Sequence, residues 1–382
     1  MQGWMIALIV VAAVVVAAAV ALLLIMLIFV HNVLGQRTES AEAIPDKYCV
    51  DKKWFVRLNK LDRLQNLSLT AYDGIKLGAT LVKQAEKPAR VVICCHGYDC
   101  DMRFVQPQAK MFYDRGFDVL LPAMRGHVGS EGKIGMAWID RFDVLRWIDK
   151  VVALYGEEVQ IALYGVSMGG SAVIGAAGMN PPPQVKCVID DCGFSSQVDQ
   201  SASAIRHAGL PNFFIHFYNA GLKMIHGYSL QEADFVPLAK NMTIPALFFH
   251  GEEDKFVPFA LGQKLFDACG SAVKKFVAVP GAEHACAYVA DKEQYTAELT
   301  EFIDAHVEGS QPVEHPELDF EPEAEPVKEE KAKEEDSSEA PAQGENAIEE
   351  HAEEEKADEP AHAEEPAKEE EKPAEEQAKE QE

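Results

Sequence analysis

Basic residues are scarce in this sequence of 382 residues. The chain has 35 Lys and Arg against 62 Asp and Glu, which gives a formal net charge of −27. A protein that binds nucleic acid needs a basic face for the phosphates, so this balance argues against that class of function. The acidity is concentrated at one end, because residues 309–382 hold 29 acidic and 7 basic side chains, a net charge of −22. The first 308 residues carry the remaining −5, an ordinary value for a globular protein.

The C-terminal segment also has few large apolar side chains. From Gly309 onward it is built mainly from Glu, Ala, Lys and Pro, with repeats such as Glu-Glu-Pro-Ala that follow no fixed period. Such a segment cannot offset its conformational entropy by burial, so we expect residues 309–382 to be disordered and solvated. An acidic tail can also bind a basic partner or divalent ions. The sequence does not favour that alternative, and it names no partner for the tail.

Charged residues and prolines are both absent from residues 4–30. A helix of these 27 residues, at about 1.5 Å per residue, is long enough to cross a hydrocarbon core of about 30 Å with some tilt. A cleaved signal peptide needs a basic start, an apolar run of about 7–15 residues and a nearby small-x-small site. Here no Lys or Arg precedes the run, and Ala41-Glu42-Ala43 lies well past its end. We therefore expect an uncleaved single-pass membrane anchor over residues 4–30, followed by a connector over residues 31–64 that is either a linker or packs on the core.

Orientation and compartment follow from residues outside the span. No basic residue precedes it, and four follow it closely: Arg37, Lys47, Lys52 and Lys53. The positive-inside rule then places the rest of the chain in the cytoplasm. The eight cysteines include no C-x-x-C pair and no Cys/His cluster of the kind that binds zinc. Several lie in apolar runs typical of buried strands, which fits a reducing compartment; these are Cys94, Cys95 and Cys187.

Residues 65–308 alternate short apolar runs with amphipathic segments. We expect a hairpin of strands 67–72 and 75–82, separated by Asp73-Gly74. Further strands are expected at 90–95, 117–122, 159–164, 185–190, 246–250 and 275–279, and helices include 137–155 and 168–179. This alternation predicts an α/β fold with a mostly parallel twisted sheet and helices on both faces. Such folds place their chemistry beyond the carboxyl ends of the strands.

A candidate nucleophile follows the strand expected at 159–164. The sequence there reads Gly165-Val166-Ser167-Met168-Gly169 and leads directly into a helix. This is a G-x-S-x-G motif in the strand–turn–helix context of a nucleophile elbow. Small neighbours are needed because the serine occupies a sharp turn with a strained backbone. The amide dipoles of the helix that begins beside Ser167 favour negative charge there.

A serine hydroxyl needs a base to remove its proton. The candidate base is His284, directly after the last expected strand, and Asp254, after the preceding strand, would orient its imidazole and stabilise the charged form. The chain order Ser, Asp, His is the one known for this elbow. His207, His216 and His226 lie in an insert and His96 begins another motif, so they compete poorly as bases. The fallback acids are Glu252, Glu253, Asp190 and Asp191.

Acyl transfer also needs hydrogen-bond donors for the developing oxyanion. We expect the backbone N–H of Met168, next after the nucleophile, to be one donor. The other is expected from the loop after the strand 90–95, where the backbone N–H of Tyr98 would point inward. Two roles stay open for the tyrosine side chain: lining the acyl pocket, or packing alone.

These features, in this order along about residues 66–306, resemble the α/β-hydrolase superfamily. The segment Arg125-Gly126-His127-Val128-Gly129-Ser130 is also similar to that superfamily's loop after the fourth strand. The chain resembles the serine-aminopeptidase-like branch and its membrane-anchored esterase and thioesterase relatives. The resemblance implies hydrolysis of an ester, thioester or amide without a metal or other cofactor. It also implies that the insert at about 196–241 is a small helical cap over the site.

The insert carries apolar side chains at roughly helical spacing. They are Phe213, Phe214, Phe217, Tyr218, Leu222, Met224 and Ile225. They either form a pocket for an apolar acyl group or dock the cap on the core, and the sequence does not decide between these. Three cysteines are expected near the site, where a thiol is either reactive or, as is more common in a cleft, passive: Cys100, Cys192 and Cys286.

The sequence therefore predicts a membrane-anchored serine hydrolase that cleaves a lipid-derived or small acyl substrate, an ester or thioester, through an acyl-enzyme. Its anchor would raise the effective concentration of membrane substrates. One alternative is a peptidase for free N-termini, which needs a carboxylate for the substrate amine; Glu232 and Asp234 in the insert are candidates. Another is a scaffold that recruits partners through its tail, but a scaffold needs none of Ser167, Asp254 and His284. Dehalogenase chemistry is disfavoured, because its nucleophile at the elbow would be Asp.

Overall fold

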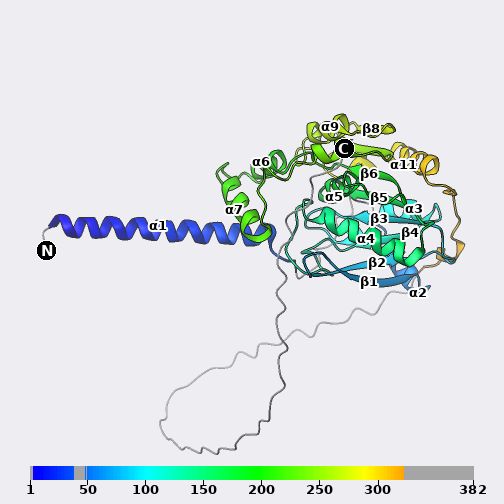
Figure 1. Cartoon of the computed structure of the whole chain (residues 1–382), viewed down its shortest axis with the longest axis horizontal. Helices are drawn as coiled ribbons and strands as arrows, with labels where there is room; N and C mark the ends of the chain where they lie inside the picture. Colours follow the sequence, from blue (N-terminus) through cyan, green and yellow to red (C-terminus); the bar gives the residue numbers. More distant parts are fainter. Residues whose placement is uncertain (1–2, 38–47, 49, 322–382) are drawn as a thin grey trace, which may run out of the picture. The chain divides into compact units, whose positions relative to one another are not determined.

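The computed structural model describes residues 3–37, 48 and 50–321 (Figure 1). The disorder predicted for the tail beyond residue 321, the Ala41-Glu42-Ala43 motif and Lys47 lie outside the described residues.

The sheet has eight strands in the order β1-β2-β4-β3-β5-β6-β7-β8. The pairs β1–β2 and β2–β4 are antiparallel, and all the others are parallel. The predicted mostly parallel sheet is confirmed. The strands are β1 (Leu64–Thr70), β2 (Lys76–Val82), β3 (Arg90–Cys95), β4 (Asp118–Pro122), β5 (Gln160–Val166), β6 (Val185–Asp191), β7 (Ala246–Gly251) and β8 (Lys274–Val279). The predicted hairpin is present too, although β1 begins and ends earlier than predicted. It ends at Thr70 because Ala71 already belongs to the turn, where its N–H donates a hydrogen bond to the Ile75 carbonyl.

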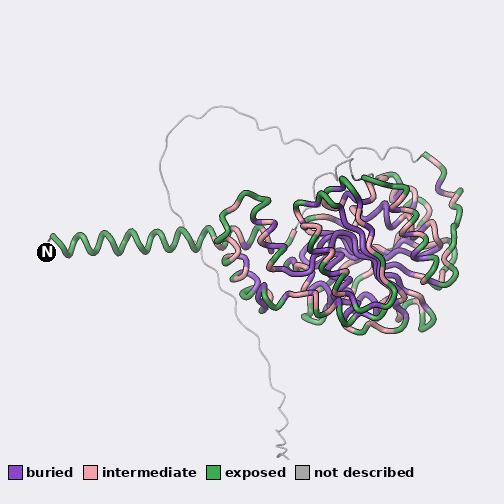
Figure 2. Tube along the Cα trace, turned by 90° about the horizontal axis from the view of Figure 1, so that it is seen from above, coloured by how far each residue is buried: buried purple, intermediate pink, exposed green. Residues whose placement is uncertain are grey.

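Side chains alternate along the strands between two separate cores. On β3, Val91 and Ile93 belong to one core and Val92 and Cys94 to the other. Both faces are covered by helices, as Figure 1 shows, and burial is concentrated in the sheet between them (Figure 2). The first face packs against α4 (Asp140–Tyr155), α5 (Met168–Ala177), α8 (Val236–Asn241) and α9 (Phe259–Ala268). The second packs against α2 (Lys52–Lys60), α3 (Gln106–Tyr113), α10 (Ala287–Ala290) and α11 (Lys292–His306).

The packed part of the chain is wider than the segment 65–308 that composition suggested. Helix α2 lies in the predicted connector, and its Trp54 and Leu58 are fully buried on the second face of the sheet. Beyond α11, the short helix η3 (Pro316–Leu318) adds Leu318 to the same core. Of the two alternatives for the connector, packing on the core therefore describes α2. Leu318 lies within the segment 309–382 that was expected to be disordered, where a single apolar residue in polar surroundings gives a weak signal.

The cap consists of α6 (Gln197–His207) and α7 (Phe214–His226), which lie between β6 and β7. The N-terminal helix α1 (Gly3–Leu34) is the one helix of the described residues that is long and apolar enough to cross a membrane. A signal sequence near the N-terminus passes the same test of length and hydropathy. Figure 2 shows α1 exposed along most of its length, but Val30 and Leu34 in its last turns are buried beside α7.

Candidate active site

The sharp turn between β5 and α5 holds Ser167 in a strained conformation, with φ 56° and ψ −116°. The Ser167 N–H donates to the Asp191 carbonyl at 2.7 Å, which fixes the turn to β6. Glycine is required on both sides of the serine. A Cβ on Gly165 would lie 2.2 Å from the Gly169 carbonyl oxygen, and one on Gly169 would lie 2.2 Å from the Cys95 carbonyl oxygen. The local sequence therefore permits the close approach of strand, turn and helix on which the elbow depends.

A chain of hydrogen bonds joins Ser167, His284 and Asp254. His284 Nε2 lies 3.0 Å from Ser167 Oγ, and His284 Nδ1 lies 2.7 Å from Asp254 Oδ2. When Nδ1 donates its proton to the carboxylate, Nε2 has a free lone pair to accept the serine proton. The structure thus brings together three predicted residues from the ends of β5, β7 and β8.

The Asp254 carboxylate is held from several sides. Its Oδ1 accepts the backbone N–H groups of Phe256 at 3.0 Å and Val257 at 2.8 Å. Its Oδ2 faces His284 and also lies 3.6 Å from Nε2 of the buried His250. His250 Nε2 is 2.9 Å from the Val257 carbonyl, to which the neutral ring donates, and burial lowers the pKa of His250. These contacts orient Asp254 toward the imidazole of His284.

The four fallback acids have other environments. Asp191 accepts hydrogen bonds from the hydroxyls of Tyr295 at 2.8 Å and Tyr164 at 3.2 Å, and burial raises its pKa to about 6. Asp190 accepts the Gly193 N–H at 3.0 Å. Glu252 and Glu253 are exposed. Of the five candidate acids, Asp254 is the one hydrogen-bonded to His284.

The two predicted oxyanion donors flank Ser167. Met168 is the first residue of α5, so its N–H has no acceptor within the helix. Tyr98 follows Gly97, which packs against the serine: a Cβ at Gly97 would lie 3.5 Å from Ser167 Cβ. Within the described residues, no backbone hydrogen bond uses the N–H of Tyr98 or Met168. Both groups are therefore available to an oxyanion.

Two buried histidines shape the loop that carries Tyr98. His96 Nε2 accepts the Met124 N–H at 3.0 Å, so its Nδ1 donates to the Gly97 carbonyl at 2.8 Å. His127 Nε2 accepts the Asp99 N–H at 3.1 Å. Burial lowers the pKa of both rings, that of His96 to about 3, so both stay neutral at physiological pH. This supporting role of His127 was not predicted from the sequence, where only the surrounding motif was recognised.

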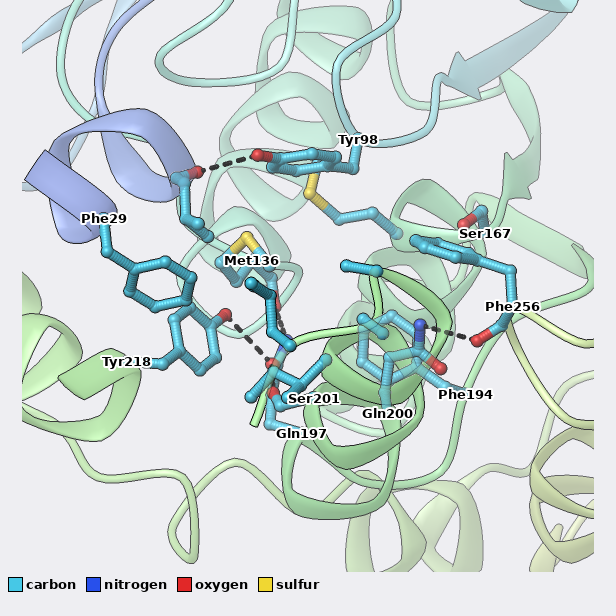
Figure 3. Close-up of a pocket in the computed structure, with 16 residues that line it drawn as sticks. Phe29, Tyr98, Met136, Ser167, Phe194, Gln197, Gln200, Ser201, Tyr218 and Phe256 are labelled. Atoms are coloured by element: carbon cyan, nitrogen blue, oxygen red, sulfur yellow. Dashed lines mark hydrogen bonds between the residues drawn. The ribbon is translucent and has the colours of Figure 1, made fainter. Parts of the chain in front are cut away.

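A cavity of about 260 Å³ opens beside Ser167 (Figure 3). Among the described residues, none of those lining it is charged. Tyr98 lines the cavity and also makes hydrogen bonds, so it does more than pack. The large apolar and aromatic lining residues include Phe29, Val33, Tyr98, Met136, Met168, Phe194, Leu210, Tyr218 and Phe256; Gln197, Gln200 and Ser201 are polar.

The apolar residues of the cap divide between two roles. Tyr218 lines the cavity, and its hydroxyl donates to Gln197 Oε1 at 3.3 Å. Leu222 and Ile225 instead pack with the buried end of α1. Phe213 and Met224 are exposed at 48% and 62%. Tyr218 thus fits the alternative in which the apolar cap residues form a pocket. Leu222 and Ile225 fit neither alternative fully, because they pack against α1 and not against the core of the sheet.

In the described part of the chain, one group of side chains is close enough together to bind a metal ion. The ligand atoms of Cys192, Asp254 and His284 lie within 4.8 Å of one another. Burial and the neighbouring Asp191 raise the pKa of the Cys192 thiol well above its usual range. Because the thiolate is the metal-binding form, this environment disfavours Cys192 as a ligand. Burial likewise raises the pKa of Cys100 to about 12.

Residues at the end of α1 reach the site, which the sequence did not predict. Arg37 donates to the Tyr98 hydroxyl at 2.8 Å and to Asp99 Oδ1 at 2.6 Å. Phe29 and Val33 line the cavity directly. In the sequence, Phe29 and Val33 look like any other apolar residue at the end of a membrane span. Arg37 was used there only to predict the orientation of the span.

The sheet order, the elbow and the cap define an α/β hydrolase. The sequence profile of the family described as "Serine aminopeptidase, S33" matches residues 86–207 and 222–309, and the chain belongs to this family. It is 24% identical over 216 residues to "Uncharacterized protein YqkD" of Bacillus subtilis (strain 168), a match that covers 56% of this chain and 70% of that protein.

Two solved structures share the fold. The Pyrococcus furiosus esterase Pf2001 superposes with a TM-score of 0.55 at 16% identity, covering 71% of this chain and 97% of its own. The α/β hydrolase GrgF from Penicillium sp. sh18 gives a TM-score of 0.51 at 18% identity, covering 64% of this chain and 98% of its own. The predicted α/β-hydrolase fold is confirmed, and with it the general class of hydrolase.

Proposed function

We propose that this protein is a membrane-anchored serine hydrolase that cleaves an ester or thioester with an apolar acyl group. The observation that carries the proposal is the continuous hydrogen-bonded chain from Asp254 through His284 to Ser167, at the end of an uncharged, mainly apolar cavity. The apolar walls suit an acyl chain, and the serine suits attack on its carbonyl carbon.

The proposed reaction uses each of these groups in turn. Ser167 Oγ attacks the carbonyl while its proton passes to His284 Nε2, and Asp254 stabilises the imidazolium that forms. The backbone N–H groups of Tyr98 and Met168 bind the oxyanion of the tetrahedral intermediate. His284 then gives the proton to the leaving alcohol or thiol, and the acyl group stays on Ser167. A water molecule, activated by His284, releases the acid and restores the serine.

The cavity favours this chemistry over that of an aminopeptidase, despite the descriptive name of the family. A free N-terminal amine needs an anionic partner, and no lining residue among those described is acidic. The two acids considered for this role are placed differently: Glu232 is exposed and accepts the Ser229 hydroxyl, and Asp234 accepts the Val236 N–H. Neither lines the cavity.

We further propose that α1 is a permanent anchor with the catalytic domain on its cytoplasmic side. The support is its apolar, exposed length and the basic residues Arg37, Lys52 and Lys53 that follow it, with none before it. Protease digestion of sealed spheroplasts should leave the domain intact. Digestion from the outside would contradict this orientation.

Fluorophosphonate labelling of the full-length protein in detergent tests the reaction. We expect one adduct, located on Ser167 by peptide mass spectrometry, and its loss in Ser167→Ala and His284→Ala. Ser201 lines the same cavity, so Ser201→Ala is the matched serine control and should label normally. Labelling that survives Ser167→Ala would refute the assignment of the nucleophile. A folded protein that neither labels nor hydrolyses any ester would favour the scaffold alternative.

A further inference from the structure

The helix proposed as the anchor also forms one wall of the candidate active site. Phe29 and Val33, one turn apart near the end of α1, line the same cavity as Ser167. Figure 3 shows Phe29 and Tyr218 at one end of this cavity, with Ser167 and Phe256 at the other. A chain bound along the cavity with its carbonyl at the serine therefore points its far end toward α1.

This end of α1 is firmly joined to the domain. Leu34 is fully buried, and its carbonyl accepts the Ile134 N–H at 3.1 Å. Val30 fits against Gly221 of α7 so closely that a Cβ on that glycine would lie 2.7 Å from a Val30 methyl group. The ring of Phe29 meets that of Phe214 edge-on, with centroids 5.0 Å apart. Phe29 and Val33 are thus fixed elements of the cavity wall.

The same residues mark where α1 would leave a bilayer. The apolar run ends at Val30, before His31 and Asn32, so Phe29 lies at its boundary, and Val33 follows about 6 Å further along the helix axis at about 1.5 Å per residue. The adjoining cap has a partly exposed aromatic group, Phe213, Phe214 and Phe217, and an exposed Met224 further along α7. Exposed aromatic and apolar side chains next to a membrane span are typical of the interface with lipid.

We propose that the substrate is a long-chain acyl lipid resident in the membrane, and that its acyl chain passes from the bilayer along α1 into the cavity, with its far end against Phe29 and Val33. This inference rests on the proposed function and adds the substrate class and its route. We place the source of this acyl chain in the bilayer because the apolar surface of α1 is continuous from its exposed span to the cavity wall. A water-soluble short-chain ester would make no use of that wall.

The first test is a change in chain-length preference. The full-length protein in phosphatidylcholine vesicles would be assayed with 4-methylumbelliferyl oleate in the bilayer and 4-methylumbelliferyl acetate in the water. Val33→Trp narrows the cavity at the end that a long acyl chain would reach. We therefore expect the ratio of kcat/KM for oleate to kcat/KM for acetate to fall about tenfold in this variant. Ile28, 60% exposed on the same helix, provides the matched control, and Ile28→Trp should leave the ratio within twofold of the wild type. Equal ratios in all three proteins, or hydrolysis of the acetate alone by the wild type, would overturn the inference.

A second test needs no altered residue in the wall. An alkyl fluorophosphonate with a diazirine at the end of a long chain would label Ser167 by displacement of fluoride, and irradiation would then cross-link the chain end to its neighbours. We expect cross-links within residues 26–34 of α1, and none there in Ser167→Ala. A Ser167 adduct whose cross-links lie wholly outside α1 would overturn the lipid route and leave the hydrolase proposal intact. No adduct on Ser167 would instead refute the proposed function itself.

Discussion

The Arg37 guanidinium donates a 2.8 Å hydrogen bond to the hydroxyl of Tyr98, which donates in turn to the carbonyl of Val33 at 3.1 Å. Arg37 also pairs with Asp99 Oδ1 at 2.6 Å. Burial on its own would lower the pKa of Arg37, but the hydrogen bond to Asp99 raises it, so the charge is retained throughout the physiological range. The segment after α1 is thus tied to the loop whose Tyr98 N–H is the proposed oxyanion donor.

We expect Arg37→Ala to lower kcat for a short, water-soluble ester about tenfold while KM stays within about twofold. The reason is that the oxyanion contact forms fully only in the transition state. Loss of a whole oxyanion donor costs about 10²–10³ in kcat, and a loosened loop should cost less. Steady-state kinetics on 4-nitrophenyl butyrate would measure this.

Arg146, an exposed arginine paired with Asp149, offers the control, and Arg146→Ala should behave as the wild type. Arg37→Lys should recover part of the loss, since it retains a charge but not the forked geometry. A rise in KM with an unchanged kcat would show that Arg37 contributes to binding instead of positioning.

The sequence predicted the parts of the site that depend on local signals. Ser167 was identifiable because an elbow needs glycines within two residues of the nucleophile, and His284 and Asp254 because polar residues directly follow apolar strands. The contributions of Phe29, Val33 and Arg37 depend on contacts between segments far apart in the chain, such as Arg37 with Tyr98. No short pattern marks such contacts. The same holds for Trp54, which is buried because the short basic helix α2 packs on one face of the sheet.

We expect Asp254→Asn to lower kcat by about 10³–10⁴, because the asparagine amide would donate to His284 Nδ1 and favour the wrong tautomer. Its carbonyl would still accept the N–H groups of Phe256 and Val257, so the midpoint of thermal unfolding should change little. The rate of fluorophosphonate labelling at Ser167 should fall in parallel with kcat. The neighbouring Glu253 has the same charge but is exposed, so Glu253→Gln should label at the wild-type rate. An equal loss in both variants would point to a general effect of charge and against Asp254 as the orienting acid.

We expect Gly169→Ala to destabilise the domain by about 3 kcal/mol or more, since its Cβ would lie 2.2 Å from a main-chain oxygen that cannot easily move. Gly281→Ala is the comparison. Gly281 has a positive φ of 71°, but a methyl group added there would meet no atom within 4 Å, so the cost is backbone strain alone, about 1–2 kcal/mol. Thermal unfolding of both full-length variants in detergent would separate the two effects. If both variants lost the same stability, the close packing of the elbow would not be what requires glycine at position 169.

A last prediction concerns the dependence of stability on pH. Asp140, the first residue of α4, is completely buried, and burial, followed by the nearby Asp143, raises its pKa to about 7. One oxygen accepts the Ala137 N–H at 2.8 Å, and the other has no partner among the described residues. Between about pH 4 and pH 7 the unfolded chain releases this proton while the folded chain keeps it, so the free energy of unfolding falls as the pH rises. In Asp140→Asn the amide replaces the protonated acid and this dependence disappears. The variant should therefore gain stability relative to the wild type from pH 4 to pH 7, by a few kcal/mol at about 1.4 kcal/mol per pKa unit, and the difference should be constant at higher pH. Chemical denaturation of wild type and variant at a series of pH values would measure this gain. The control is Asp149→Asn, which removes an exposed acid from the same helix and should show no such gain. A difference between wild type and Asp140→Asn that did not vary with pH would mean that Asp140 is already ionised in the folded protein at pH 4.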